Sequence, residues 1–81
     1  MTSEITIRRK FRNMIEADGM VVAPGVYDGL TATLVARAGF SAAYMTGAGT
    51  SAAKGLPDYG LMTMTEMVAN AGTIAGAAGI P

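Results

Sequence analysis

Hydrophobic and polar positions follow two different periods along the chain, and the longer period predicts three helices. In residues 3–17, 28–38 and 63–78, apolar side chains recur at the spacing of one face of an α-helix. Such a face needs a neighbour to pack against, so we expect it to be buried. The side chains expected to face inward are Ile7, Phe11, Met14 and Ile15 in the first helix, Leu30, Leu34 and Val35 in the second, and Met64, Met67, Val68, Ala71 and Ile74 in the third.

Side chains at the start of each helical segment support these boundaries. Ser3 and Asp28 each carry an oxygen that accepts a hydrogen bond from a free amide in a first helical turn. Thr63 and Glu66 have the spacing of a capping box, in which each side chain binds the backbone N–H of the other residue. We therefore expect Asp28 to cap a helix rather than to act as a catalytic acid.

Two other residue types are expected to contribute to packing. Gly72 and Gly76 lie inside the third helix, where each costs roughly 1 kcal/mol relative to alanine, so we expect a close neighbour there. Methionine is unbranched and fills irregular gaps, and most of the seven methionines fall on the predicted inward faces. We interpret them as part of the core.

Two short apolar runs predict strands. Met20–Ala23 contains adjacent valines and is bounded by glycine and proline, which suits a strand buried on both faces in a parallel sheet. Phe40–Met45 is the second run. Ile80–Pro81 follows the third helix and has the character of an approach to another strand.

The order of these elements predicts an α/β fold with a parallel sheet. Helices alternate with strands, and this alternation builds parallel sheets whose strands are joined by crossover helices. Two strands are too few to form such a sheet, and a third strand is due where the chain stops. We therefore expect residues 1–81 to be the N-terminal portion of a single, longer α/β domain.

Composition and charge exclude several classes of function. The 81 residues are 51% hydrophobic and 15% charged, which is too apolar for a disordered chain. Six basic and six acidic residues balance, and the basic cluster Arg8–Lys10 is interpreted as a solvated helix face rather than a nucleic-acid site. No apolar stretch reaches the roughly 20 residues that span a bilayer. We expect a cytoplasmic protein that binds neither nucleic acid nor membrane.

Cysteine and histidine are both absent from the sequence. The chain therefore lacks a thiolate nucleophile, the commonest general base and the commonest metal ligand. Any chemistry must use carboxylates, hydroxyls, lysines, backbone amides or a metal ion held by oxygen atoms.

The segment Thr46–Gly60, "TGAGTSAAKGLPDYG", is predicted to be a loop after the second strand. Ligands of parallel α/β folds lie beyond the carboxyl ends of the strands, which is where this segment begins. Gly47 and Gly49 lack side chains, so their backbone N–H groups can approach an anion, and the Thr46 hydroxyl is a further donor. The residues alone leave two interpretations open: a cradle for a carboxylate or phosphate, or a plain turn.

Two side chains near this segment also have alternative interpretations. Asp58 follows Pro57, and its carboxylate either orients a metal-bound water or substrate hydroxyl, or forms an Asx-type turn. Tyr44 ends the second strand, and its phenol either donates to a bound carboxylate or covers the core.

The segment "PGVYDGLTATLVARAGFSAAYMTGAGTSAAKGLPDYGLMTMTEM" resembles the isocitrate lyase and phosphoenolpyruvate mutase superfamily. The closest likeness is to its methylisocitrate lyase-like and carboxyphosphonoenolpyruvate mutase-like members. The motifs "PGVYD", "ARAGF", "YMTGAG" and "GLPDYG" occur in the right order and spacing, and the resemblance covers Lys10 to Pro81. Together these motifs are specific, although each alone is not.

The resemblance implies the opening part of a (β/α)8 barrel that depends on Mg²⁺ and forms a homotetramer. Such proteins make or break a carbon–carbon or carbon–phosphorus bond beside an α-oxo carboxylate, through a metal-stabilised enolate. The family's substrate-carboxylate loop falls on Tyr44, Thr46, Gly47 and Ala48, and its loop aspartate falls on Asp58, near the metal and its waters.

This sequence also departs from the family pattern. Ala48 stands where lyase members often have glycine, and its methyl group narrows the approach. The family's main metal-binding aspartates are expected on the strand after Ile80–Pro81, and its gating loop later still. We therefore expect a lyase of the methylisocitrate lyase type as the complete protein and no activity from the 81 residues alone. The alternatives are a phosphonomutase, an oxaloacetate decarboxylase, or a non-catalytic truncated product.

Overall fold

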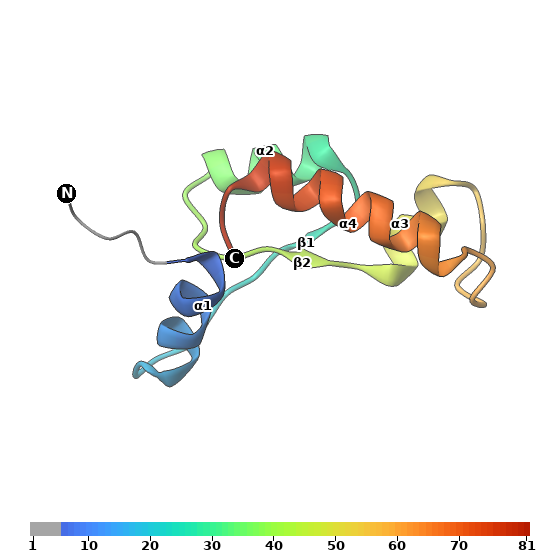
Figure 1. Ribbon diagram of the computed structural model, residues 1–81. Coiled ribbons are helices and arrows are strands. Elements are labelled where there is room, and N and C mark those ends of the chain that lie inside the picture. The colour runs from blue at the N-terminus through green and yellow to red at the C-terminus, as the bar shows by residue number, and fades with distance from the viewer. Residues whose placement is uncertain (1–5) are drawn as a thin grey trace.

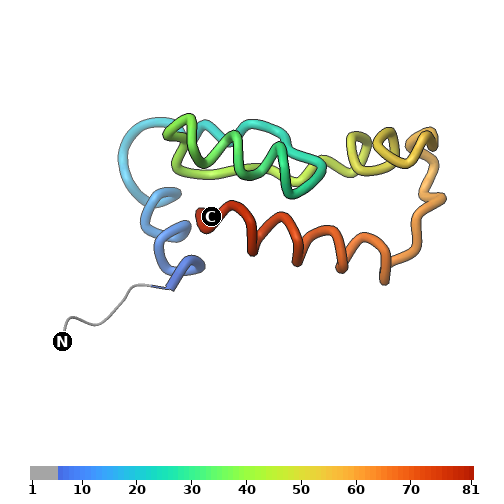
Figure 2. Tube along the Cα trace, turned by 90° about the horizontal axis from the view of Figure 1, so that it is seen from above, coloured from blue at the N-terminus to red at the C-terminus, as the bar shows by residue number. Residues whose placement is uncertain are grey.

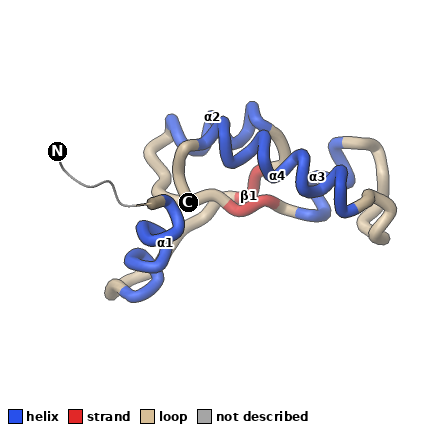
Figure 3. Tube along the Cα trace, viewed as in Figure 1, coloured by secondary structure: helices blue, strands red, loops and turns tan. Residues whose placement is uncertain are grey.

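The computed structural model describes residues 6–81 and confirms an α/β chain with parallel strands (Figure 1). Most of its regular structure is helical, and the strands are short (Figure 3). In chain order the elements are α1 (Ile7–Glu16), β1 (Gly25–Val26), α2 (Gly29–Arg37), β2 (Tyr44–Met45), α3 (Gly47–Ala53) and α4 (Met64–Ala78).

The two strands pair in parallel. Gly25 lies opposite Tyr44, and the next residues along each strand pair in the same register. The Tyr44 amide donates to the Pro24 carbonyl at 3.0 Å, and the Thr46 amide donates to the Val26 carbonyl at 3.0 Å. The parallel arrangement places the carboxyl ends of both strands at the same edge.

Both strand predictions need correction. Met20–Ala23 is not a strand: β1 begins later, at Gly25, and Met20 is 89% exposed rather than buried. Only the last two residues of Phe40–Met45 form β2. A strand exists only where its backbone finds a partner, and within residues 6–81 the β1–β2 pairing begins at Pro24.

The helix predictions are confirmed in position, and so are most of their caps. Asp28 caps α2 and Thr63 caps α4, each in a capping box, with Glu66 completing the second one. α1 is shorter than predicted and begins after Thr6, whose hydroxyl accepts from an amide in the first turn. The predicted cap Ser3 lies outside the described residues.

Helices α2 and α4 pack against each other on one side of the strands (Figures 1 and 2). They approach each other closely at Gly29, where an added Cβ would lie 3.3 Å from the Cγ2 of Thr73 and 3.7 Å from the Cβ of Ala77. The buried hydrophobic cluster comprises Val26, Ala32 and Ile74, with Val35, Ala43, Met45 and Ala78 partly buried against it.

Helical periodicity predicted the helices correctly but overestimated the buried faces. Ile74 is buried as expected, and Val35 packs against the core. Periodicity shows that a face needs a neighbour, and within residues 6–81 the most extensive helix contact is between α2 and α4. The predicted inward side chains that are in fact exposed are Ile7, Phe11, Ile15, Leu30, Leu34, Met64 and Val68.

The packing role predicted for Gly72 and Gly76 finds no partner within residues 6–81. A Cβ added at either position would meet no heavy atom within 4 Å in the described part of the chain, beyond the backbone of α4 itself. The close helix contact uses Gly29 of α2 instead. The core role predicted for the methionines is wrong for Met20 and Met64, which are both exposed.

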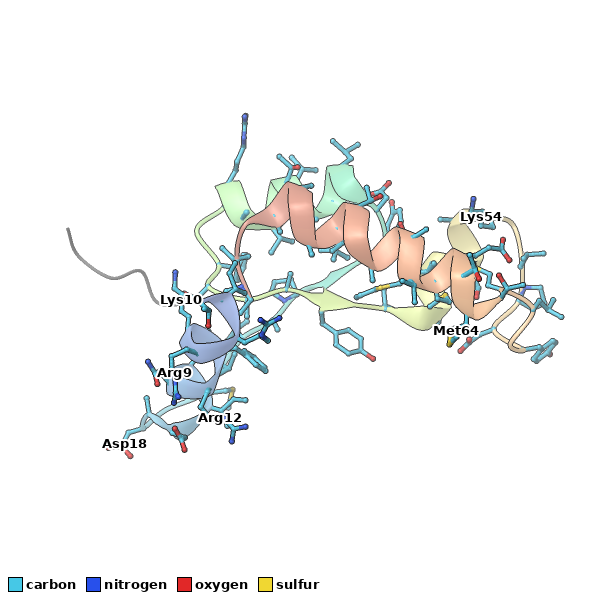
Figure 4. The ribbon with its side chains drawn as sticks, viewed as in Figure 1. Arg9, Lys10, Arg12, Asp18, Lys54 and Met64 are labelled. Atoms are coloured by element: carbon cyan, nitrogen blue, oxygen red, sulfur yellow. The ribbon has the colours of Figure 1, made fainter. Side chains whose placement is uncertain are left out.

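Basic side chains lie on the exposed surface of α1, in agreement with the solvated helix face that the sequence predicted. Arg9, Lys10 and Arg12 project from α1, at the opposite end of the molecule from Lys54 (Figure 4). All three are exposed. No helix among residues 6–81 has the length and apolar character needed to cross a membrane.

The chain returns to β2 after α4. The Ala43 amide donates to the Pro81 carbonyl at 2.8 Å. Successive amides of a strand point to opposite sides, and the Tyr44 amide points to β1. Pro81 therefore lies along the other edge of β2, where the approach to a further strand was predicted.

Candidate functional site

The segment predicted as a loop after the second strand begins with a helix. Thr46 follows β2, has an extended backbone conformation and caps α3. Its hydroxyl accepts a hydrogen bond from the Gly49 amide at 3.1 Å. Its carbonyl accepts from the Thr50 amide at 2.9 Å, which closes the first turn. The prediction of one continuous loop over residues 46–60 is therefore wrong for its first half, because a threonine cap and a run of small residues allow a helical turn.

Gly49 allows the turn to pack closely. A Cβ at this position would lie only 2.6 Å from the Cγ2 of Thr46 and 3.3 Å from the Cβ of Tyr27. The Gly49 amide is also already used by the Thr46 hydroxyl. The sequence suggested that the Gly49 N–H is free to bind an anion, and this is wrong because the Thr46 hydroxyl already accepts from it. Instead, the missing side chain of Gly49 lets α3 start close to the end of β1.

Free donors gather at the first turn of α3. Within residues 6–81 the amides of Gly47 and Ala48 have no hydrogen-bond acceptor, as is usual for the first amides of a helix. The Thr46 hydroxyl accepts from Gly49, so its own proton remains available to a ligand. We call Thr46, Gly47 and Ala48 the cradle. Its donors match the needs of a carboxylate.

Tyr44 and Asp58 make no side-chain hydrogen bond to the cradle among residues 6–81. Tyr44 is in β2, and its side chain is 61% exposed. Asp58 is exposed in the segment between α3 and α4, where the Tyr59 amide donates to the Pro57 carbonyl at 3.0 Å. Within the described chain the Asp58 carboxylate accepts no hydrogen bond, so it does not form the Asx-type turn that we considered.

A hydrogen-bond network behind the cradle was not predicted from the sequence. The Asn70 amide group donates to the Tyr27 carbonyl at 2.9 Å and to the Thr50 hydroxyl at 3.3 Å. The Thr50 hydroxyl in turn donates to the Thr46 carbonyl at 2.7 Å. One signal was available: Asn70 lies on the same side of the predicted helix as Ile74, and a polar side chain there needs partners.

Two carboxylates near the site are occupied by helix capping. The Thr31 backbone N–H, and after it the Thr31 hydroxyl, lower the pKa of Asp28, against an opposing effect of desolvation. The Thr63 backbone N–H, and then its side chain, lower the pKa of Glu66 in the same way. Both groups are held ionised by their caps, which confirms the capping role expected for Asp28.

The described residues do not form a metal centre by themselves. Among residues 6–81, no three carboxylate, histidine or cysteine side chains gather closely enough to hold a metal ion. Mg²⁺ usually binds through one or two carboxylates and keeps several waters. Residues 6–81 therefore offer no cluster of three such side chains, but this does not exclude a site with fewer protein ligands.

The chain matches a known protein family over most of its length. Residues 11–81 match the family described as phosphoenolpyruvate phosphomutase. The chain is 55% identical over 73 residues to 2,3-dimethylmalate lyase of Eubacterium barkeri, covering 89% of this chain and 25% of that protein. It is 38% identical over 80 residues to 2-methylisocitrate lyase of Bacillus subtilis (strain 168), covering 99% of this chain and 27% of that protein.

The fold also matches a solved structure. A trigonal crystal form of 2,3-dimethylmalate lyase, described as a PEP mutase/isocitrate lyase superfamily member, superposes with a TM-score of 0.80. The sequences are 46% identical, and the match covers 91% of this chain and 25% of that one. The chain spans about a quarter of the length of the curated relatives it matches.

Proposed function

The chain belongs to the phosphoenolpyruvate mutase/isocitrate lyase superfamily, and from this premise we propose that the complete protein is a Mg²⁺-dependent carbon–carbon lyase. Its substrate is a 2-hydroxy dicarboxylate or tricarboxylate, and one product is an α-oxo acid such as pyruvate. The fold we propose for the complete protein is a (β/α)8 barrel that begins with these residues. It acts as a cytoplasmic homotetramer.

The observation that carries this proposal is the cradle at the carboxyl end of β2. Gly47 and Ala48 offer two backbone amides without acceptors in the described chain, and Thr46 adds a hydroxyl proton. Three neutral donors suit a substrate carboxylate, since hydrogen bonds to an ionised acceptor are roughly twice as strong as neutral ones. In the proposed site Tyr44 donates a further hydrogen bond to this carboxylate.

The proposed reaction balances without a redox partner. The hydroxyl group of the substrate loses its proton, its C–O bond becomes a carbonyl, and the adjacent carbon–carbon bond breaks. The electron pair moves to the carbon beside the other carboxylate, giving an enolate-like species that then takes up a proton. Mg²⁺ supplies stabilisation of the developing negative charge. From 2,3-dimethylmalate or 2-methylisocitrate the α-oxo product is pyruvate.

Asp58 is proposed to act near the metal and its waters. Its carboxylate is free of hydrogen bonds among the described residues, so it remains available as an acceptor for a bound water or a substrate hydroxyl. It lies in the connection between α3 and α4. The main protein ligands of Mg²⁺ are proposed to follow Pro81.

The assay that tests this function uses the complete protein and both hydroxy acids. We expect pyruvate release from 2,3-dimethylmalate or 2-methylisocitrate with Mg²⁺, and loss of release with a chelator. Asp58→Ala is expected to lower kcat by at least about 100-fold, in the range of a lost acid or base. The 81-residue chain alone is expected to release none. Failure of the complete protein on both substrates would refute the lyase proposal.

A phosphonomutase is the second candidate, because the matched family is described by a mutase activity. A carboxylate cradle serves either reaction, since both substrates carry a carboxylate beside the reacting carbon. The same protein is therefore assayed for conversion of phosphoenolpyruvate to phosphonopyruvate, followed by ³¹P NMR, and for carbon dioxide release from oxaloacetate. Activity in either assay without hydroxy-acid cleavage would favour the mutase or the decarboxylase.

A further inference from the structure

We propose that Asn70 is a positioning residue for the cradle, acting through the hydroxyl of Thr50. The inference rests on the proposed function, because it assigns Asn70 a part in carboxylate binding. Asn70 does not touch the ligand itself. It fixes the direction in which the first amide of α3 points.

The first step is that Asn70 joins three parts of the chain at one point. Both hydrogens of its side-chain amide are used: one bonds the Tyr27 carbonyl after β1 at 2.9 Å, the other bonds Thr50 of α3 at 3.3 Å. These partners are 43 and 20 residues away in sequence. Asn70 itself is in α4, which is held against α2 by the core contact at Ile74. The side chain therefore ties α3 to the best-packed part of the molecule.

The second step concerns the hydroxyl of Thr50. The Thr50 side chain is only 2% exposed, so its hydroxyl depends on protein partners rather than on water. It accepts from Asn70 and donates to the Thr46 carbonyl at 2.7 Å. Because Asn70 can only donate from its nitrogen, it directs the Thr50 proton away from itself and towards Thr46.

The third step follows from the planarity of the peptide bond. The Thr46 carbonyl and the Gly47 amide belong to the same trans peptide unit, so their C=O and N–H bonds point in opposite directions. Thr50 holds this carbonyl through two bonds, from its hydroxyl at 2.7 Å and its own amide at 2.9 Å. Fixing the carbonyl therefore aims the Gly47 N–H at the ligand side of the cradle.

The experiment uses the complete protein and pyruvate as the probe of carboxylate binding. Thr50→Val keeps the shape and removes the hydroxyl, whereas Thr50→Ser keeps the hydroxyl. Asn70→Asp keeps the shape but replaces the two donors with acceptors, which repel the Tyr27 carbonyl and draw the Thr50 proton away from Thr46. The matched control is Thr33→Val, since the Thr33 hydroxyl also donates to a carbonyl four residues earlier, that of Gly29, away from the cradle.

We expect the dissociation constant of pyruvate to rise roughly tenfold in Thr50→Val and Asn70→Asp. A change of this size corresponds to the binding free energy that one hydrogen bond contributes. Thr50→Ser and Thr33→Val are expected to bind pyruvate as the parent protein does. The KM of the carboxylate substrate should follow the same order. If Thr50→Val and Asn70→Asp lower only the melting temperature and leave pyruvate binding unchanged, the side chains are merely structural ties and the inference is refuted.

A second readout separates this inference from the proposed function. Exchange of the Thr50 amide hydrogen with deuterium reports on the bond to the Thr46 carbonyl. We expect exchange to be faster in Asn70→Asp than in Thr33→Val. If the parent protein binds no pyruvate, the proposed function fails, and faster exchange would still support control of the turn by Asn70. Unchanged exchange in Asn70→Asp would refute that control whatever the ligand.

Discussion

Individual glycines in this chain have opposite roles, although the sequence alone makes them look alike. Gly49 and Gly72 both lie inside helices. A Cβ at Gly49 would collide with Thr46 and crowd Tyr27, whereas one at Gly72 meets nothing within 4 Å outside its own helix backbone. Close approach requires the first glycine, while no contact among the described residues requires the second.

This contrast gives a prediction with a built-in control. Gly72→Ala removes the helical cost of glycine and is expected to stabilise the protein by about 0.5–1 kcal/mol. Gly49→Ala gains the same helical preference but must move the first turn of α3, and we expect a net loss of stability and weaker carboxylate binding. Thermal and chemical unfolding of the two variants measures both effects. Equal stabilisation by the two changes would contradict the packing described for Gly49.

The cap at Asp28 gives α2 a pH dependence. The Thr31 backbone N–H and hydroxyl lower the pKa of Asp28, so the ionised form is favoured in the folded state. Such a group stabilises the fold at pH values above its unfolded pKa, and the contribution is lost as the pH falls through the folded pKa. Asp28→Asn keeps a capping oxygen but does not titrate.

We therefore expect the melting temperature of the parent protein to fall more steeply with acidification than that of Asp28→Asn. The comparison is made by thermal unfolding from neutral pH down through the carboxylate range. The same slope in both proteins would contradict the lowered pKa of Asp28.

The role of a single side chain was predictable from the sequence when its hydrogen-bond partner lies close to it in the chain. The capping roles of Asp28 and Thr63 depend on residues three positions away, so the pattern alone predicts them. Asn70 was not singled out, because its partners are 43 and 20 residues distant. The cradle residues are contiguous, so the family resemblance predicts them as a group.

At the scale of elements, helices were easier to predict than strands. A helix satisfies its backbone internally, so α2 and α4 form where periodicity and caps place them. A strand needs a partner, and that partner is set by the rest of the fold, so β1 lies beyond its predicted apolar run and β2 is shorter than its own. The short helix α3 was missed because glycines in "TGAG" suggested a loop, whereas the Thr46 cap stabilises a turn.

The edge of β2 predicts where the next strand lies. Ala43 already donates to Pro81, and Met45 is the next residue whose amide points to the same side. In a parallel ladder its acceptor would be the carbonyl two residues after Pro81. We expect the Met45 amide of the complete protein to exchange with deuterium as slowly as the Tyr44 amide, which is bonded to Pro24. Exchange at the rate of an exposed amide would contradict a third strand at this edge.

At the scale of the whole molecule, the described chain leaves many apolar side chains uncovered. Exposed hydrophobic residues occur on α1, α2 and α4 and on the segment before β1. A monomer rarely leaves such surface to water, and the proposed barrel would cover it with further strands and helices. The same completion is proposed to bring metal ligands to the cradle, since no three ligating side chains gather among residues 6–81.

The central claim is that Thr46, Gly47 and Ala48 bind the substrate carboxylate. A crystal structure of the complete protein with Mg²⁺ and pyruvate tests it most directly. The account predicts pyruvate carboxylate oxygens within roughly 2.7–3.2 Å of the Gly47 and Ala48 nitrogens and the Thr46 hydroxyl. Pyruvate bound with its carboxylate on other groups, and these three donors facing only water, would contradict the account.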